Sequence, residues 1–477
     1  MSYSDYVQAA KIGKKDYQSK LMAGESPTLE VLDDILHTTK SYREVSLGLV
    51  QIPLAQVVGT KTAGRSNSFS SNFMPILDPN SEFASKWMTL STAQQEEGIT
   101  DPIIAYEYMN KFYVLEGNKR VSVLKYYDAV SVMGQVTRIL PKKTDDYDVK
   151  LYYEFVDFYS LSEINYLYFS KLGSFEKLQT VVGKKPGEVW SHNERIDFRS
   201  LFLTFQSKYD EIGGENLKEI TCGDAFLAFT QLYGYKELLE MSDSELTKLI
   251  NSNFSEFELM SDTEVDLRMT ASTKKASVLT KLLTPGAKHL KVAFIYEKTS
   301  ASSAWTYSHE LGRLHLNEVF PDDVTTVYYD SINSHNIKEA IDDAIANGCN
   351  VIFTTSPTFS QASLKAAIAN PKITILNCSL HDPHTSMRTY YARMHEAKFI
   401  MGAVAGSMAA HDKIVYIADY PIYGTIANIN SFAQGVKMTN PRAKIHLLWS
   451  CLKDVDVEEQ IKQLQPDCVS DKDLSVP

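Results

Sequence analysis

Apolar residues recur along the chain in two different rhythms. In the polar stretch 1–48, Leu29, Leu32, Ile35 and Leu36 repeat at the spacing of one helix face, which predicts helix. From residue 291 onward, short β-branched and aromatic runs alternate with helical patterns of about ten residues. This alternation indicates a parallel sheet covered by helices on both faces. The strands are expected at 291–296, 324–329, 351–355, 373–377 and 413–418.

The change of rhythm divides the chain into several stretches, and the fold class that we expect is multidomain α/β. A polar segment with a Pro-Gly turn after Thr284 is typical of a linker. The two α/β sets after the linker predict two lobes, the second apparently incomplete. The expected parts are an N-terminal helical segment (1–48), a mixed α/β domain (49–144), an aromatic-rich helical domain (145–260), the linker (261–289), a first lobe (290–411) and a partial second lobe (412–477).

Composition narrows the classes of protein that fit this organisation. With 44% hydrophobic and 22% charged residues, the chain has an ordinary soluble composition. No apolar run reaches the roughly 20 residues of a spanning helix, so we expect no membrane insertion. The N-terminus shows no export pattern, and the first cysteine is Cys222. We therefore expect a cytoplasmic protein with reduced thiols and no metal site.

The net charge of −11 argues against a broad nucleic-acid surface but leaves room for a local basic patch. DNA is thus a partner that the overall charge does not support. In the helical domain, a helix, a glycine turn and a capping box at Ser242–Glu245 would suit a helix-turn-helix. Glu237 and Glu240 are unsuited to reading DNA, so structural packing is favoured for these helices.

Polar and aromatic residues follow the predicted strands of the C-terminal part. The carboxyl ends of parallel strands form the usual ligand-binding edge of such a sheet. Hydroxyl, amide and carboxylate groups there would orient a small polar ligand, and the rings of Trp305, Phe359 and Tyr423 could stack on it. Two alternatives stay open: Trp305 packs in the core, and Ser302 and Ser303 only cap a helix. The candidate ligand residues are Ser302, Ser303, Trp305, Asp330, Thr355, Ser356, Phe359, Asn377, Tyr420 and Tyr423.

Several motifs in this part resemble the Bmp/Med class of basic membrane lipoproteins, which have a type I periplasmic-binding-protein fold. They lie at 291–296, 304–309, 390–406 and 430–441. The resemblance implies binding of a nucleoside or another small polar solute, which family members pass to an ABC importer. Where nucleoside-binding members carry an aromatic residue and an asparagine, this chain has Ser300 and Ala301, so the nucleoside itself is not secured.

A second candidate site lies in the mixed α/β domain, where a strand, a glycine turn and a helix follow one another. Gly117, Asn118, Lys119 and Arg120 combine a helix N-terminus with two cations, which suits a phosphate group. The alternative is a solvated basic turn before an amphipathic helix.

The surrounding segments 52–57, 98–104 and 136–139 resemble the ParB/sulfiredoxin-like fold, which implies CTP or ATP as a nucleotide ligand. Gly-Asn-Lys-Arg replaces the usual Gly-Glu-Arg-Arg of that family. Sulfiredoxin chemistry is excluded, because no cysteine precedes Cys222.

These observations favour a cytoplasmic sensor of a small polar solute, with a homodimer left open. One alternative is a Bmp-type substrate-binding protein of an ABC transporter. Another is a ParB-like protein that binds or hydrolyses nucleotide in a DNA-linked role. We assign no catalytic residue, since Glu116 is the only carboxylate near the phosphate turn, and the sequence indicates a binding protein more than an enzyme.

Overall fold

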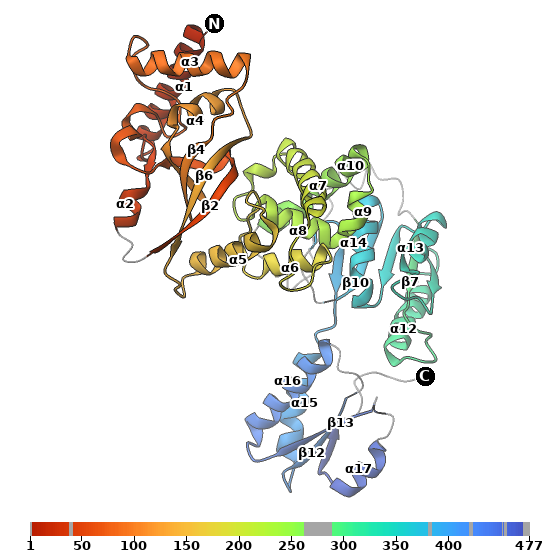
Figure 1. The fold of residues 1–477 in the computed structure, drawn as a ribbon. Helices are drawn as coiled ribbons and strands as arrows, with labels where there is room; N and C mark the ends of the chain where they lie inside the picture. The colour runs from red at the N-terminus through yellow and green to blue at the C-terminus, as the bar shows by residue number, and fades with distance from the viewer. Residues whose placement is uncertain are drawn as a thin grey trace. The chain divides into compact units, whose positions relative to one another are not determined.

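The structure is a computed structural model of the 477-residue chain. It divides into two compact units, Met1–Thr247 and Lys248–Pro477, which are described separately (Figure 1). The residues that the structure describes, apart from the side chains of Arg65 and Tyr423, are 2–37, 42–261, 289–379, 384–418, 423–450, 452 and 456–470.

Unit 1 contains a six-stranded mixed sheet in the order β1-β3-β5-β4-β6-β2. Of the four residues predicted on one helix face, Leu32, Ile35 and Leu36 lie in a helix at Leu32–His37, whereas Leu29 precedes a two-residue strand. A long strand begins at Tyr42. Strand β2 runs antiparallel to β6, and β4 runs antiparallel to β5, whereas the other neighbours are parallel. The strands are β1 (Glu30–Val31), β2 (Tyr42–Pro53), β3 (Val57–Thr60), β4 (Ile103–Tyr108), β5 (Lys111–Glu116) and β6 (Ser131–Pro141).

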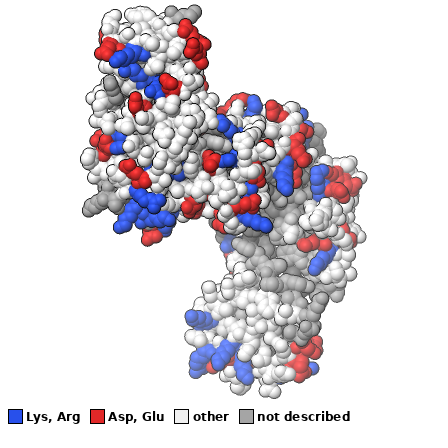
Figure 2. Space-filling view, in the orientation of Figure 1, with Lys and Arg blue, Asp and Glu red and all other residues white. Residues whose placement is uncertain are grey.

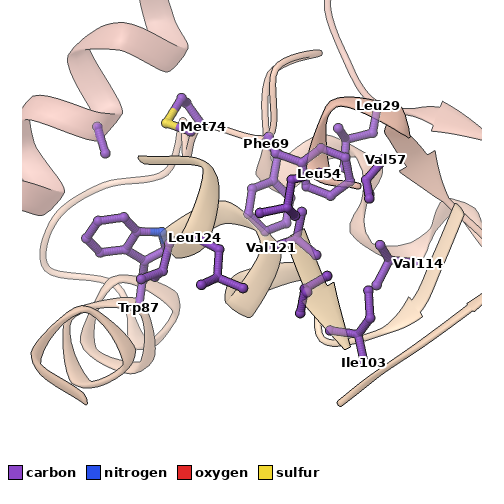
Figure 3. Close-up of a cluster of buried hydrophobic side chains, with 14 of the residues drawn as sticks. Leu29, Leu54, Val57, Phe69, Met74, Trp87, Ile103, Val114, Val121 and Leu124 are labelled. Carbon is purple, nitrogen blue, oxygen red and sulfur yellow. The ribbon is translucent and has the colours of Figure 1, made fainter. Parts of the chain in front are cut away.

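Side-chain alternation along β5 gives each face of this sheet its own core. Phe112 and Val114 face the larger core, where helices α1 (Ser2–Met22), α3 (Glu82–Glu96) and α4 (Asn118–Tyr126) cover the sheet (Figure 3). Tyr113 points to the opposite face and packs against the short helix α2 (Leu32–His37). A period of two places successive residues on opposite faces, as expected for a strand.

The rest of unit 1 is helical and rich in buried aromatic rings, as predicted. Phe198 and Phe202 stack at 6.1 Å, and both meet the edge of Phe226. The capping box at Ser242 is also confirmed, since the hydroxyl of Ser242 accepts from the N–H of Glu245. The helices are α5 (Tyr147–Ser162), α6 (Ser174–Val181), α7 (His192–Glu211), α8 (Cys222–Tyr233) and α9 (Tyr235–Leu239). Helix α10 (Asp243–Ser261) begins in unit 1 and continues into unit 2, which starts at Lys248.

Residues 262–288, most of the predicted linker, lie outside the described residues. After them, a five-stranded parallel sheet in the order β11-β10-β9-β7-β8 forms the first lobe of unit 2. Its elements are β7 (Leu290–Ile295), α12 (Ala304–Val319), β8 (Val324–Tyr329), α13 (Ile337–Ala346), β9 (Val351–Thr354), α14 (Ser360–Ala369), β10 (Thr374–Cys378) and β11 (Arg388–Tyr390).

The second lobe has a parallel sheet in the order β13-β12-β14 within the described part of the chain. Along β12, Tyr416 packs toward α15 and α16, whereas Val415 and Ile417 pack toward α17. Both faces are therefore apolar, which confirms the predicted parallel α/β class. Its elements are α15 (Met394–Met408), β12 (Lys413–Ala418), α16 (Tyr423–Thr439), β13 (Lys444–Trp449), α17 (Val457–Leu464) and β14 (Cys468–Ser470).

Candidate functional site

The strand ends of the first lobe bring five polar residues to one edge of the sheet. Strands β7, β9 and β10 are parallel neighbours, so the residues that end or follow them share that edge. We call these residues the strand-end group: Glu297, Thr355, Ser356, Asn377 and Ser379.

Hydrogen bonds tie most of this group together. The hydroxyl of Ser356 donates to Oε2 of Glu297 at 2.8 Å, and the hydroxyl of Thr355 donates to the carbonyl of Ile295 at 3.0 Å. These bonds link the end of β9 to the end of β7. The strand-end loops therefore form one polar network, as the strand-end rule predicts.

Asn377 lies at the centre of the network and is fully buried. Its amide nitrogen lies 2.9 Å from the Thr354 hydroxyl and 2.9 Å from the Ser356 carbonyl. Its Oδ1 atom is buried and has no hydrogen-bond partner among the described residues, and the same holds for the hydroxyl of Ser379. A buried acceptor left without a donor costs about 1–3 kcal/mol. The group therefore has two buried polar atoms with unused hydrogen-bonding capacity.

Trp305 adds an aromatic side to this edge. Its indole nitrogen donates to the carbonyl of Thr355 at 2.7 Å, and the side chain is half-buried. The ring lies 5.1 Å from His309, one helical turn further along α12, and His309 lies 6.1 Å from Tyr390. Three rings from α12 and β11 thus lie in sequence near Thr355.

The histidine in this row is neutral at physiological pH. Burial lowers the pKa of His309 below its ordinary value, although a hydrogen bond to the Trp305 carbonyl opposes that shift. Because Nδ1 lies 2.9 Å from the carbonyl, it carries the proton, and Nε2 is the acceptor.

The other predicted ligand residues are placed differently. Ser303 caps α12 by accepting from the N–H of Thr306 at 3.3 Å, which is the alternative that the sequence left open, and Ser302 bonds to Thr299 in the preceding turn. Asp330 accepts from Ser331 after β8. The ring of Phe359 is fully buried and offers no face to a ligand here. Tyr420 and the side chain of Tyr423 lie outside the described residues.

Glu297 and Ser379 were not among the predicted ligand residues. Glu297 lies two residues after β7 and Ser379 directly follows β10, so the strand-end rule could have found them. His309 and Tyr390 carried a weaker signal, because only the four-residue spacing from Trp305 places His309 on the same helix face. The pairing of Tyr390 with Cys378 across β10 and β11 follows only from the register.

The predicted phosphate turn in unit 1 uses its polar groups within the protein. Gly117 adopts a φ of 105°, and a Cβ there would lie 2.6 Å from Ile103, so glycine is required for packing. The guanidinium of Arg120 donates to the carbonyls of Asp101 and Pro102. The ammonium of Lys119 lies 4.8 Å from the centre of the Phe83 ring. Both cations of the turn therefore have contacts within unit 1.

Oδ1 of Asn118 is buried without a partner among the described residues. This amide oxygen accepts hydrogen bonds, and so do the oxygens of a phosphate, so the unpartnered Oδ1 is not evidence for a bound phosphate. A phosphate at this turn stays a prediction.

Within the described ranges, no group of three or more His, Cys, Asp or Glu side chains could hold a metal ion. No helix there combines the length and apolar character that a bilayer span needs.

Comparison with known proteins identifies the C-terminal region. Residues 289–461 match the Bmp family, described as ABC transporter substrate-binding protein PnrA-like. The match covers none of residues 1–288. The predicted Bmp resemblance is therefore confirmed for this region, whereas the ParB-like resemblance finds no support in the match.

Two curated relatives cover the same part of the chain. A purine-binding protein of Brucella abortus is 28% identical over 169 residues, which are 34% of this chain and 48% of that protein. A putative ABC transporter glucose-binding protein of Haloferax volcanii is 21% identical over 160 residues, which are 34% of this chain and 41% of that protein. The chain thus spans less than half the length of these relatives.

Solved structures of similar proteins were also found. A solute-binding protein of an ABC transporter from Conexibacter woesei has a TM-score of 0.30 at 17% identity, over 36% of this chain and 58% of that one. A transcriptional activator of the comK gene from Bacillus halodurans has a TM-score of 0.31 at 18% identity, over 37% and 59%.

Proposed function

We propose that the Bmp-like region, residues 289–461, binds a purine base or nucleoside at the strand-end group of its first lobe. The observation that carries this proposal is the buried Oδ1 of Asn377, which has no donor among the described residues. A purine presents N–H donors on a flat ring. One such donor would satisfy Asn377, and the ring would lie beside Trp305.

The purine class is supported by the Brucella relative, whose name states purine binding. The Haloferax relative is named for glucose, so a sugar is the competing ligand within the same family. Buried amide and hydroxyl acceptors suit both ligands, but a row of three aromatic rings suits a planar base better than a small sugar. We therefore choose the purine.

The role proposed for this binding is that of the substrate-binding component of an ABC-type transporter. The family description and the name of the Haloferax relative are of this kind. The cytoplasmic sensor that the sequence favoured has less support, because no comparison concerns location. The substrate-binding role is therefore better supported than the sensor.

The test is calorimetric titration of the full chain with adenosine, adenine and glucose, repeated on Ser379→Ala. Because the hydroxyl of Ser379 is buried and has no partner in the described part, its removal should not lower the stability of the free protein. If a purine hydrogen-bonds there, Ser379→Ala should weaken adenosine binding by about 3- to 10-fold.

A matched control removes a hydroxyl from the same lobe but away from the strand ends. Ser308 on α12 donates to the carbonyl of Ala304, so Ser308→Ala should leave adenosine affinity unchanged. Binding of glucose without adenosine would refute the purine class. Equal adenosine affinity in the wild type and Ser379→Ala would remove the strand-end group as its site.

A further inference from the structure

One corner of the sheet in unit 1 gathers positive charge. In the pairing of β2 with β6, Tyr42 lies opposite Pro141 and Arg43 opposite Leu140. Strand β6 ends at Pro141, and Lys142 and Lys143 follow directly. The register therefore places three cations at one end of the strand pair, and we call them the basic cluster: Arg43, Lys142 and Lys143. Figure 2 shows Lys and Arg side chains gathered on the surface of this unit.

Helix α5 forms the other wall of a cavity at this corner. The hydroxyl of Tyr153 donates to the carbonyl of Pro141 at 2.6 Å, and the ammonium of Lys143 lies 4.5 Å from the centre of the Tyr153 ring. These contacts fix α5 against the end of β6. The space between them is a cavity of about 430 Å³, lined by the basic cluster, Tyr42, Tyr153 and Asp157 among others.

No ion pair neutralises the basic cluster within the described ranges, although several other cations of unit 1 are paired. Lys61 pairs with Asp33, and Lys150 pairs with Asp145. Among the described residues that line the cavity, Asp157 is the single carboxylate. A local excess of positive charge in a chain of net charge −11 attracts anions.

The chemistry of the lining residues indicates which anion fits. Arg43 has a planar fork of donors that matches two oxygens of one phosphate, and a lysine ammonium adds a point charge. Tyr42 is 45% exposed, so a planar group could stack on its ring. A volume near 430 Å³ is larger than a single phosphate needs and falls within the usual range of small-ligand sites, about 300–1,000 Å³.

We propose that this cavity binds a nucleoside phosphate, with the basic cluster on its phosphates and Tyr42 beside its base. This site is separate from the purine site proposed for residues 289–461 and does not depend on it. It also differs from the predicted phosphate turn, where Arg120 and Lys119 already contact carbonyls and a ring of unit 1. In the described part, the cations of the basic cluster donate to no carbonyl or carboxylate, although Lys143 contacts the Tyr153 ring as Lys119 contacts Phe83.

The experiment is calorimetric titration of the full chain with ADP, pyrophosphate and adenosine. We expect ADP to bind more tightly than pyrophosphate, and the affinity for ADP to fall as salt rises, because the cluster is exposed and screened. Arg43→Gln and Lys142→Ala should each weaken ADP binding by about 10-fold. Adenosine affinity should be the same in the wild type and these variants.

Two control variants separate this proposal from its alternatives. Lys86→Ala removes an exposed lysine of α3 that pairs with Glu82, and it should leave ADP binding unchanged. Arg120→Ala should also leave ADP binding unchanged if the phosphates lie at the basic cluster. Arg43, Lys142 and Lys86 are exposed, whereas Arg120 is half-buried in α4 and donates to two carbonyls. Circular dichroism should show wild-type folding for all four variants.

Three results would overturn the proposal. The first is no ADP binding by the full chain at millimolar concentration. The second is loss of ADP binding in Arg120→Ala with no effect of Arg43→Gln, which would return the phosphate to the turn at Gly117. The third is binding of a DNA oligonucleotide through the cluster without binding of ADP, which would make the surface a nucleic-acid contact.

Discussion

The carboxylate of Glu256 on α10 accepts two hydrogen bonds from Thr385, one from the backbone N–H at 3.1 Å and one from the hydroxyl at 2.6 Å. The N–H of Ser386 donates to the same oxygen at 2.8 Å, and Nδ1 of His384 lies 3.2 Å from the other oxygen. The carboxylate of Glu256, near the end of α10, thus accepts hydrogen bonds from the loop that leads into β11. The end of α10 is therefore fixed to the first lobe of unit 2.

This contact predicts an acid-dependent loss of stability. Burial alone would raise the pKa of Glu256, but the hydrogen bonds from His384, Thr385 and Ser386 outweigh it and lower the pKa to about 2. A folded pKa below the unfolded value stabilises the fold above the unfolded pKa. This stabilisation is lost as pH falls from about 4.5 toward 2, and it amounts to roughly 3 kcal/mol at neutral pH.

Glu256→Gln should therefore destabilise unit 2 at pH 7 and flatten the dependence of its stability on pH in that acidic range. Hydrogen exchange at the amides of Thr385 and Ser386 should become faster in the variant. Glu258, which is exposed on the same helix, provides the control, and Glu258→Gln should change neither property. Unchanged exchange at both amides in Glu256→Gln would show that the contact contributes little.

A buried ion pair holds α5 on the sheet of unit 1. Glu107 on β4 and Arg138 on β6 form an ion pair with side chains 1% and 4% exposed, and the hydroxyl of Tyr152 donates to the Glu107 carboxylate. Glu107→Gln leaves the Arg138 charge buried without a full counter-charge, so we expect a loss of about 3–5 kcal/mol in chemical denaturation.

The exposed pair of Lys86 with Glu82 is the control, because Glu82→Gln should cost well under 1 kcal/mol. Replacing both Glu107 and Arg138 by apolar residues of similar size should recover part of the loss. If the double variant were less stable than Glu107→Gln, desolvation of the unpaired arginine would not be the cause.

Substitutions of Trp305 distinguish between ligand contact and core packing as the role of its ring. In Trp305→Phe the ring remains but the hydrogen bond to Thr355 is lost, so stability should fall by about 1 kcal/mol while purine affinity changes little. In Trp305→Ala both ring and hydrogen bond are lost, and we expect about 10-fold weaker adenosine binding. Lower stability of Trp305→Ala with unchanged adenosine affinity would assign the ring to the core.

The C-terminal fold could be predicted because its signal is local. Strands β7, β8, β9 and β10 of the first lobe are short apolar runs, and periodic helices follow the first three, so element type follows from residues that are neighbours in sequence. The short strand β11 (Arg388–Tyr390) is not such a run and was not predicted. The order β11-β10-β9-β7-β8 was not predicted, since it depends on pairing between distant strands. The long strand β2 was also missed, because its exposed positions resemble the polar stretch before it.

In the candidate site too, positions set by local sequence could be predicted, whereas contacts set by the fold could not. The strand-end rule places Thr355, Ser356 and Asn377 at one edge, as the structure does. The rule could not show that the amide nitrogen of Asn377 donates to the Thr354 hydroxyl and the Ser356 carbonyl. Nor could it show that Oδ1 has no partner among the described residues, because both facts depend on side-chain orientation. The contacts of Lys119 with Phe83 and of Arg120 with Asp101 could not be predicted either, because these partners are distant in sequence and the fold brings them together.

The last prediction concerns the close packing of α15 against α16 in the second lobe. A Cβ on Gly402 would lie 2.1 Å from the carbonyl oxygen of Phe432, and one on Gly435 would lie 2.0 Å from that of Phe399. Backbone atoms cannot move aside as a flexible side chain can, so Gly402→Ala should force the helices apart. We expect a loss of about 1–3 kcal/mol despite the better helix propensity of alanine.

Gly312 on α12 has no atom within 4 Å of its added Cβ, so it is the matched control. Gly312→Ala should raise stability by about 0.5–1 kcal/mol, because glycine in a helix costs that much relative to alanine. The two substitutions add the same methyl group to a helix, so their opposite signs in thermal unfolding would isolate the effect of packing. If both variants shifted the melting temperature upward, the close approach of α15 and α16 at Gly402 would be wrong.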